Sequence, residues 1–384
     1  MKMWPFKGSQ QRYDAVAGDE EELKAAASAK RHGGASKPTQ TVCIVAVVTI
    51  ALFALVGLAY HTLHSPAQTQ DPAANATPPP PPSENDNNND NNSSSRCPQR
   101  REWRTLPPSD QQAYISAVLC LRTLPSTLQP SSNRTAYDDY PWIHSHVGYF
   151  THNSAPFLPW HRYFLHIYEK TLREECGYTG SLVYWDWTLD SEALEVSPVF
   201  DAATGFGGDG EVGGQVTVGR SGRCVVDGPF RNVTADYYDV KFQPHCLSRG
   251  FRDQEGNLGH IDGHEISPES IEEVLSLNEY EKFVALMESR VHDAIPFGIA
   301  GDFETFTAPY DPLFFLHHTQ LDRLWWLWQQ RQPEKGLTAY GGHKERHSMK
   351  MASLEDEIGM RKLAPSIKVA QVMDLEGDFL CYRY

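Results

Sequence analysis

The chain has 384 residues, of which 40% are hydrophobic, so it can bury the core of one or two domains. Its formal net charge is -15 at pH 7, and its Lys and Arg residues form no basic stripe. This excludes a nucleic-acid partner, because binding to a phosphate backbone requires clustered cations that displace counterions.

The first 96 residues divide into three segments of different composition. Residues 1–40 are polar and poor in aromatic residues, which predicts a disordered cytosolic tail. Thr41–Tyr60 is an uncharged apolar run of about the ~20 residues that a helix needs to cross a bilayer, and we expect it to be a membrane anchor. Residues 61–96 are rich in Pro, Asn, Asp and Ser and predict a stalk.

The distribution of positive charge predicts the orientation of this anchor. Four Lys or Arg residues stand between positions 24 and 37, whereas none follows Tyr60 until Arg96. We therefore expect a single-pass type II membrane protein whose C-terminal part is lumenal or extracellular. A cleaved signal peptide is the alternative, but the long hydrophilic segment before the run and the length of the run argue against it.

The cysteines fit an oxidising compartment. Six of the seven follow the predicted span: Cys97, Cys120, Cys176, Cys224, Cys246 and Cys381. An even number predicts up to three disulfides with open connectivity, and free buried thiols are the alternative. Sequons at Asn133 and Asn232 predict a glycoprotein.

Helical patterns dominate the remainder, residues 97–384, which we expect to form one domain. Residues 109–112 resemble a capping box and predict a helix start. A second helix is expected from Asn278 toward Met287, and a third over 313–329, after an Asp-Pro pair suited to a helix start. The glycine-rich residues 205–222 predict loops and short strands.

Two stretches place histidines among aromatic and apolar residues, where an imidazole without a partner is costly. These stretches are residues 137–170 and 308–329. Imidazoles delivered from facing helices suit copper, zinc, iron or nickel. The residue types alone therefore predict a metal site without choosing the metal.

Two carboxylates follow these histidines at helical spacing. On a helix that begins near Trp160, Glu169 comes two turns after His161. Asp322 comes one turn after His318. Both carboxylates are predicted to accept hydrogen bonds from the metal-binding rings.

Two motifs in these stretches resemble the copper signatures of the tyrosinase family. The first is His152-x4-Phe157-Leu-Pro-Trp160-His161-Arg162-x2-Leu165-x3-Glu169. The second is Asp311-Pro312-x-Phe314-Phe315-x2-His318-x3-Asp322. The resemblance to the fungal tyrosinases and catechol oxidases covers nearly all of residues 97–384.

The resemblance implies a mainly α fold: a four-helix bundle holding a type-3 copper centre, with irregular loops and a few short strands. It implies three imidazoles for each of two coppers, and oxidation of phenols or catechols by dioxygen. The first copper takes His144, His152 and His161, with His146 as the alternative to His144. The family's thioether cysteine is absent, since Phe150 stands at its position.

The second copper site departs from the family pattern of two histidines four residues apart. His292 is the first of this pair, but Pro296 stands where the second is expected, and Asp293 replaces the usual Asn. Proline has no side-chain donor and costs about 3 kcal/mol inside a helix. The second copper would keep His292 and His318 alone, so we expect weak binding. Glu288 resembles the carboxylate that holds an active-site water in the family.

Other side chains could complete the second site. Asp293 is the first alternative donor. His317 points about 100° away from His318 on a helix, which favours a packing or supporting role. His260 and His264 have ligand-like spacing, but their polar, glycine-rich surroundings indicate a solvated loop.

The function expected from the resemblance is copper-dependent oxidation of phenolic or catecholic small molecules, in specialised metabolism or pigment formation, by a protein held at a membrane through Thr41–Tyr60. A non-oxidising descendant that binds or scaffolds with one copper is the main alternative. Dioxygen carriage, as in the related haemocyanins, is the third. Catechol turnover, copper without turnover and reversible oxygen absorption distinguish the three.

Overall fold

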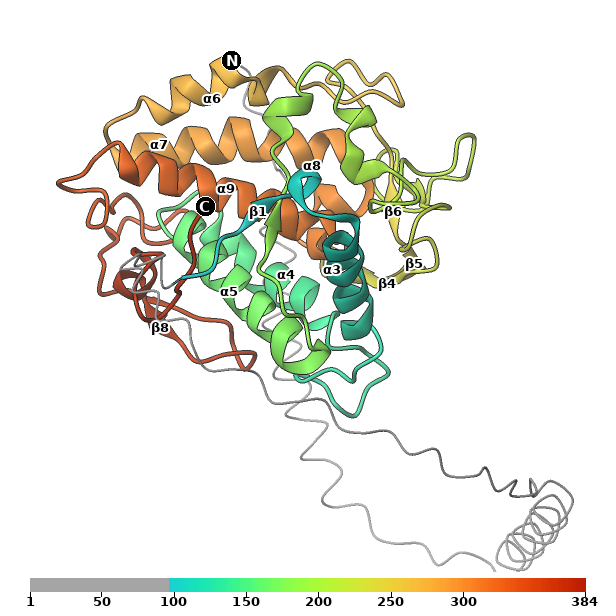
Figure 1. The fold of residues 1–384 in the computed structure, drawn as a ribbon, viewed down its shortest axis with the longest axis horizontal. Helices are drawn as coiled ribbons and strands as arrows, with labels where there is room; N and C mark the ends of the chain where they lie inside the picture. The colour runs from blue at the N-terminus through green and yellow to red at the C-terminus, as the bar shows by residue number, and fades with distance from the viewer. Residues whose placement is uncertain (1–96) are drawn as a thin grey trace, which may run out of the picture. The chain divides into compact units, whose positions relative to one another are not determined.

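The computed structural model describes residues 97–384, which are mainly helical, as the sequence predicts (Figure 1). The helices are α3 (Pro108–Leu121), α4 (Asp139–Thr151), α5 (Phe157–Cys176), α6 (Pro268–Leu275), α7 (Tyr280–Leu286), the π-helical turn η6 (Met287–His292), α8 (Asp293–Ile299) and α9 (Leu313–Gln330). The predicted tail, anchor and stalk lie outside the described residues. Within residues 97–384, every helix is too short or too polar to cross a bilayer.

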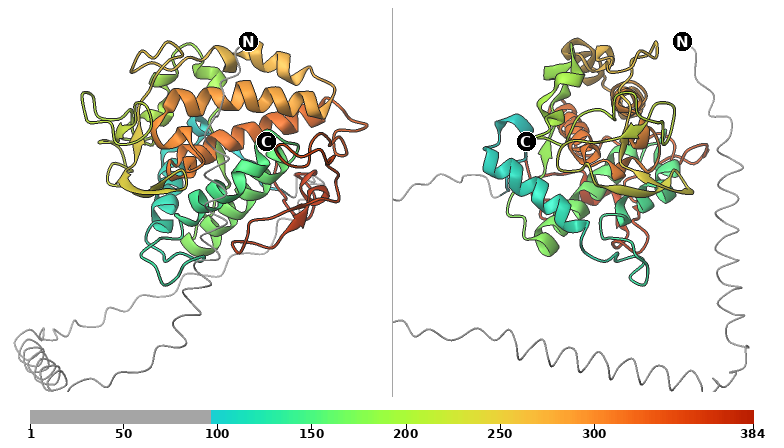
Figure 2. Two further views of the ribbon diagram at one scale, coloured as in Figure 1. Left: turned by 180° about the vertical axis from the view of Figure 1, so that it is seen from behind. Right: turned by 90° about the vertical axis from the view of Figure 1, so that its right-hand side faces the viewer.

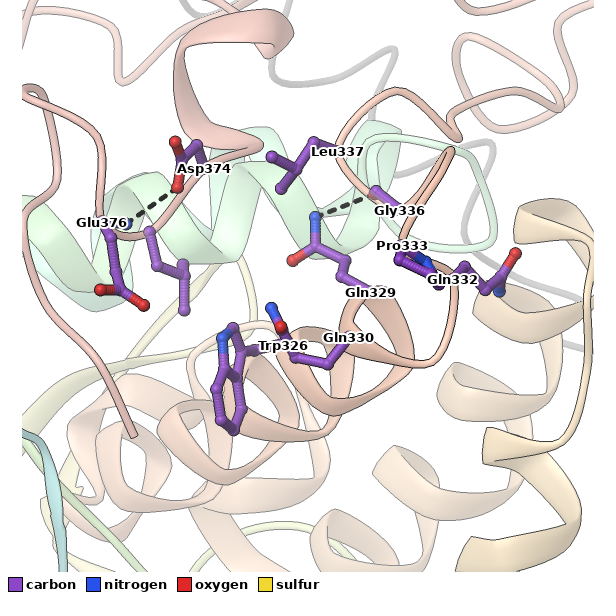
Figure 3. Close-up of a pocket in the computed structure, with 10 residues that line it drawn as sticks. Trp326, Gln329, Gln330, Gln332, Pro333, Gly336, Leu337, Asp374 and Glu376 are labelled. Carbon is purple, nitrogen blue, oxygen red and sulfur yellow. Dashed lines mark hydrogen bonds between the residues drawn. The ribbon is translucent and has the colours of Figure 1, made fainter.

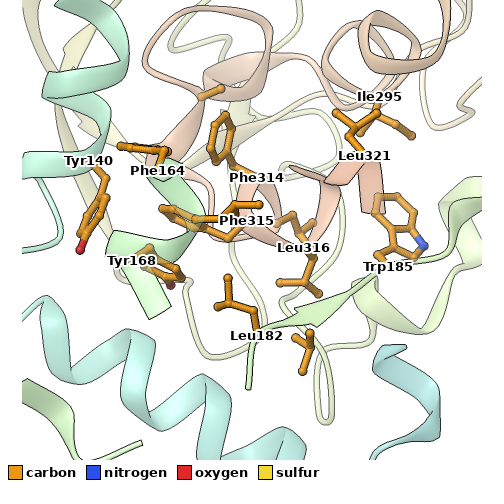
Figure 4. Close-up of a cluster of buried hydrophobic side chains, with 14 of the residues drawn as sticks. Tyr140, Phe164, Tyr168, Leu182, Trp185, Ile295, Phe314, Phe315, Leu316 and Leu321 are labelled. Atoms are coloured by element: carbon orange, nitrogen blue, oxygen red, sulfur yellow. The ribbon is translucent and has the colours of Figure 1, made fainter. Parts of the chain in front are cut away.

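Four helical segments form the predicted bundle: α4, α5, the continuous run α7–η6–α8, and α9. α5 packs along α9, and α3 covers the other side of α5 (Figures 1 and 2). The core between them is largely aromatic and takes Tyr140 from α4, Tyr168 from α5, Ile295 from α8 and Phe315 from α9 (Figure 4). The rings of Tyr168 and Phe315 stack with centroids 3.5 Å apart. This core holds the inner faces of the helices at fixed positions.

The helix ends follow local sequence signals. α5 ends at Cys176 and is capped by Gly177, whose φ of 63° is the left-handed conformation that terminates many helices. α9 begins after Asp311, whose Oδ1 accepts a hydrogen bond from the Leu313 N–H at 3.0 Å. The capping box predicted at residues 109–112 is wrong, because α3 begins at Pro108 and leaves Ser109 inside the first turn. Ser109 Oγ donates to the Asp110 carboxylate instead.

The strands of the described chain are short and pair two by two. β1 (Arg101–Glu102) runs parallel to β2 (Val183–Tyr184). The antiparallel pairs are β3 (Arg223–Cys224) with β6 (Ser248–Arg249), β4 (Thr234–Tyr238) with β5 (Lys241–Cys246), and β7 (Glu357–Ile358) with β8 (Ile367–Lys368). Short 3₁₀ turns lie along the connections between helices and strands: η1 (Trp103–Thr105), η2 (Trp187–Asp190), η3 (Leu194–Val196), η4 (Pro198–Phe200), η5 (His264–Ile266), η7 (Gly301–Glu304), η8 (Ala308–Tyr310) and η9 (Val369–Val372).

Three disulfides close the domain, which confirms the pairing of all six cysteines after the predicted span. They join Cys97 to Cys381, Cys120 to Cys176, and Cys224 to Cys246. Cross-links of this kind stabilise mainly by restricting the unfolded chain. The sequon residues Asn133 and Asn232 are both exposed, as a glycan would require.

Candidate metal centre

Three histidines from neighbouring segments converge on one side of the bundle core. His144 lies within α4, His152 is the C-terminal cap of α4, and His161 lies in the first turns of α5. All three are buried, and their candidate donor atoms lie within 4.8 Å of one another. We call these residues the first triad; they are the three that the resemblance assigns to the first copper.

The alternative residue His146 lies outside the first triad. Its Nδ1 is 2.7 Å from the Trp142 carbonyl oxygen, and its ring stacks on Trp142 with centroids 4.1 Å apart. The structure therefore brings His144, and not His146, to the two other histidines.

Backbone carbonyls set the tautomer of every ring in the first triad. The Nδ1 atoms of His144, His152 and His161 each lie 2.7 Å from a carbonyl oxygen, those of Phe306, Gly148 and Phe157 respectively. A carbonyl only accepts, so each Nδ1 carries the proton and each Nε2 keeps a free lone pair. This is the tautomer that a metal ligand needs.

Two of these lone pairs face each other at short range. His144 Nε2 lies 3.3 Å from His161 Nε2. Burial lowers the pKa of His144 to about 3 and that of His152 and His161 well below the usual range, so the rings stay neutral. Two facing lone pairs repel unless a cation lies between them. The first triad therefore fits a metal ion.

A second group of histidines lies beside the first. It consists of His292 at the end of η6 and of His317 and His318 on α9, all buried, with candidate donor atoms within 4.8 Å of one another. We call these residues the second triad. The two-imidazole site expected from the sequence differs from this arrangement, because His317 lies with His292 and His318.

Pro296 is accommodated within α8 without a break. The π-helical turn η6 widens the helix up to His292, and α8 continues from Asp293 with Pro296 as its fourth residue. π-helical turns of this kind are single inserted turns that are frequent at functional sites. Pro296 is buried one turn after His292, where the family pattern has a histidine.

The carboxylates Glu169 and Asp322 take other partners than predicted. Glu169 Oε2 accepts from Arg100 at 2.5 Å, and its Oε1 from Arg173 at 2.7 Å. Asp322 accepts from Arg162, Arg100 and the hydroxyl groups of the last two tyrosines. Glu169 therefore holds Arg100 against the bundle, and Asp322 holds Arg100 and the two C-terminal tyrosines. In the first triad, backbone carbonyls take the supporting role that was predicted for these carboxylates.

Asp293 and Glu288 lie next to the histidines. Asp293 Oδ1 is 2.9 Å from His292 Nδ1, so this carboxylate orients the ring, as a supporting role requires. Both oxygens of Glu288 accept from the Asn153 N–H at 2.8 Å. Burial raises the pKa of Glu288 well above its usual range.

Comparisons with known proteins agree with this arrangement. The common central domain of tyrosinase matches residues 134–331. The chain is 42% identical to the tyrosinase-like protein phomQ1 of Diaporthe leptostromiformis, over 97% of this chain and 98% of that protein. It is 47% identical to the tyrosinase ustQ of Aspergillus flavus, over 74% of this chain and 78% of that protein.

The chain belongs to the tyrosinase family. A polyphenol oxidase of Thermothelomyces thermophila has the same fold, with a TM-score of 0.63 and 29% identity over 76% of this chain and 90% of that protein. The two histidine triads of this tyrosinase-family chain are compatible with a binuclear copper site.

Two residues near the histidines of this family member were missed in the sequence. Phe306 supplies the carbonyl that holds His144, and its ring lies 5.2 Å from that of His152. Trp187 donates its indole N–H to His317 Nδ1 at 3.3 Å. Neither gives a sequence signal, because one acts through its backbone and the other comes from a distant segment.

A hollow of about 250 Å³ lies near the C-terminal end of α9 (Figure 3). Gln329 and Gln332 line it on one side, and Asp374 and Glu376 on another. Gln329 is eleven residues beyond His318, roughly 16 Å along the helix axis. The hollow is therefore separate from the two triads.

Proposed function

We propose that this chain is an oxidase that uses two coppers and dioxygen to convert phenolic or catecholic small molecules to quinones. The observation that carries the proposal is the pairing of two triads of buried imidazoles, of which the first has three lone pairs set by backbone carbonyls. Bound copper would accept electrons from the phenol and pass them to dioxygen.

The chain itself would orient and shield the site. The rings of Phe157 and Phe314 lie 4.8 Å from that of His161 and 4.2 Å from that of His318, and they exclude water from the histidines. Glu288 lies beside the first triad through its bond to Asn153. Because burial raises its pKa well above the usual range, Glu288 in its ionised form is a stronger base than an exposed carboxylate and would accept the proton released by a phenol.

A second candidate function follows from Pro296. A family member that lost one second-site histidine could keep the fold as a binding or scaffold protein with one copper. Oxygen uptake by the copper-loaded full-length chain with catechol separates the two functions. Turnover that disappears in the metal-free chain and in His161→Ala supports the oxidase, whereas bound copper without turnover supports the scaffold. Reversible oxygen absorption without quinone would indicate a carrier.

We also propose that Thr41–Tyr60 anchors the protein with residues 97–384 on the lumenal or extracellular side. The basic residues before this run and the three disulfides after it support this orientation. Protease treatment of intact microsomes is the test. Protection of residues 97–384 is expected, and their digestion without detergent would contradict the topology.

A further inference from the structure

The second triad contains a histidine that the family pattern does not require. The family places one ligand four residues after His292, and here that position is Pro296. His317 lies with its ring centroid 5.3 Å from that of His292 and 5.1 Å from that of His318. The ring of His317 therefore lies beside the two expected ligands of the second site, which lacks its third histidine.

The Nε2 atom of His317 has no partner among the described residues. It is buried, as is Nε2 of His318, and neither makes a hydrogen bond there. A buried polar atom without a partner loses its hydration and gains nothing in return, so native structures rarely keep one without a reason. Two such atoms within one cluster of candidate donors are the feature expected of ligands that share a metal ion.

The other nitrogen of the His317 ring is held by Trp187. The indole N–H donates to Nδ1 at 3.3 Å. Because an indole N–H only donates, Nδ1 accepts and the neutral ring carries its proton on Nε2. Coordination through Nε2 requires this proton to move to Nδ1, which breaks the bond from Trp187.

We propose that His317 supplies the third imidazole of the second metal site, in place of the donor missing at Pro296, and that Trp187 weakens this ligand. The inference rests on the proposed copper site. The second triad would then bind copper more weakly than the first triad, because the rings of the first triad already have the tautomer that coordination requires.

Copper content of the full-length chain tests the inference without reference to turnover. The chain is loaded with copper and titrated with a coloured chelator, and the copper retained per chain is measured. His317→Asn is the informative variant, since the Asn amide reaches about as far as Nδ1 and can still accept from Trp187, but it has no atom in place of Nε2. His260→Ala is the matched control, because His260 is exposed and pairs with Glu195.

We expect the wild type and His260→Ala to hold two coppers, and His317→Asn to hold one. Adding Pro296→His to His317→Asn should restore the second copper, because it returns an imidazole one turn after His292. Trp187→Phe should retain the second copper at about tenfold higher chelator concentration, since no bond has to break. Circular dichroism and the melting temperature identify any variant that fails to fold.

A purely supporting role for His317 would give a different result. If His317→Asn keeps two coppers with wild-type resistance to the chelator, the inference is wrong. If the wild type holds one copper and His317→Asn does not change it, the inference fails while the first site stands. If the wild type binds no copper, the proposed function fails with it.

Discussion

The two histidine triads differ in what holds their rings. In the first triad, each of the three rings donates from Nδ1 to a backbone carbonyl at 2.7 Å. In the second triad, His292 is held by the side chain of Asp293, and His317 accepts from Trp187. Carbonyls of the packed backbone are fixed by the fold, whereas side chains change with sequence.

This difference indicates which triad is more sensitive to substitution of the residues that support its rings. A backbone carbonyl remains when the side chain of its residue is replaced, so its support is lost only where the new side chain displaces neighbouring atoms. A supporting side chain is lost with any substitution that removes its polar atom. We therefore expect the second triad to vary more in sequence than the first. The replacement of a histidine by Pro296 lies at the site of this triad, as that expectation requires.

His161→Ala should have the largest effect, because it removes one of three ligands from the better-ordered triad. We expect copper affinity at the first site to fall by more than about 100-fold, and catechol oxidation to disappear. Copper titration and oxygen uptake measure both. Wild-type copper content together with wild-type turnover would show that the first triad is not the metal site.

Gly148→Ala should perturb the first triad and leave the second unchanged. A Cβ at this position meets Phe306 Cδ1 at 3.1 Å and two ring atoms of His152 at 3.5 Å. Phe306 must shift, and its carbonyl holds His144. We expect about tenfold weaker copper at the first site, and equal weakening of both coppers would contradict the separation of the triads.

Asp293→Asn should have a smaller effect, confined to the second triad. The amide oxygen can still accept from His292 Nδ1, but the bond loses the assistance of the negative charge. A several-fold weaker second copper is expected in the chelator titration. An equal weakening of the first copper would contradict the confinement of Asp293 to the second triad.

The smallest expected effect is on stability, and it concerns His245 in β5 and its partner Asp302 in η7. Burial alone would lower the pKa of His245, but its hydrogen bond to Asp302 in η7, at 2.8 Å, raises it above the usual value. A raised pKa stabilises the fold fully below the unfolded pKa of about 6.5, and this contribution is lost as pH rises through the folded-state pKa.

His245→Gln should therefore lower the melting temperature by roughly 1–3 °C at pH 6 and by less at pH 9. Thermal unfolding of both proteins across this range is the measurement. A difference that grows with rising pH would reverse the sign and contradict the assignment of the charged form to His245.

The resemblance to the tyrosinase motifs implied the bundle and the three histidines of the first triad, and the structure brings these histidines together. The first triad comes from residues close together in the chain. His317 was set aside because neighbours on a helix point apart. His317 lies beside His292, which belongs to another segment, and spacing within α9 does not show which residues lie opposite.

Partners from distant segments also explain why the carboxylates do not bind the rings for which they were predicted. The spacing of Asp322 after His318 is correct for one helix face, but its carboxylate binds Arg162 and Arg100 from elsewhere in the chain. Helical spacing identifies which residues share a face, and only the packed structure identifies what lies opposite.

Release of copper from the wild-type, full-length chain by a chelator tests the central claim most directly. The account predicts two coppers per chain that leave in two separate steps, with the step removed by His317→Asn occurring at the lower chelator concentration and the step removed by His161→Ala at the higher. Two coppers leaving in a single step, or only one copper bound, would contradict it.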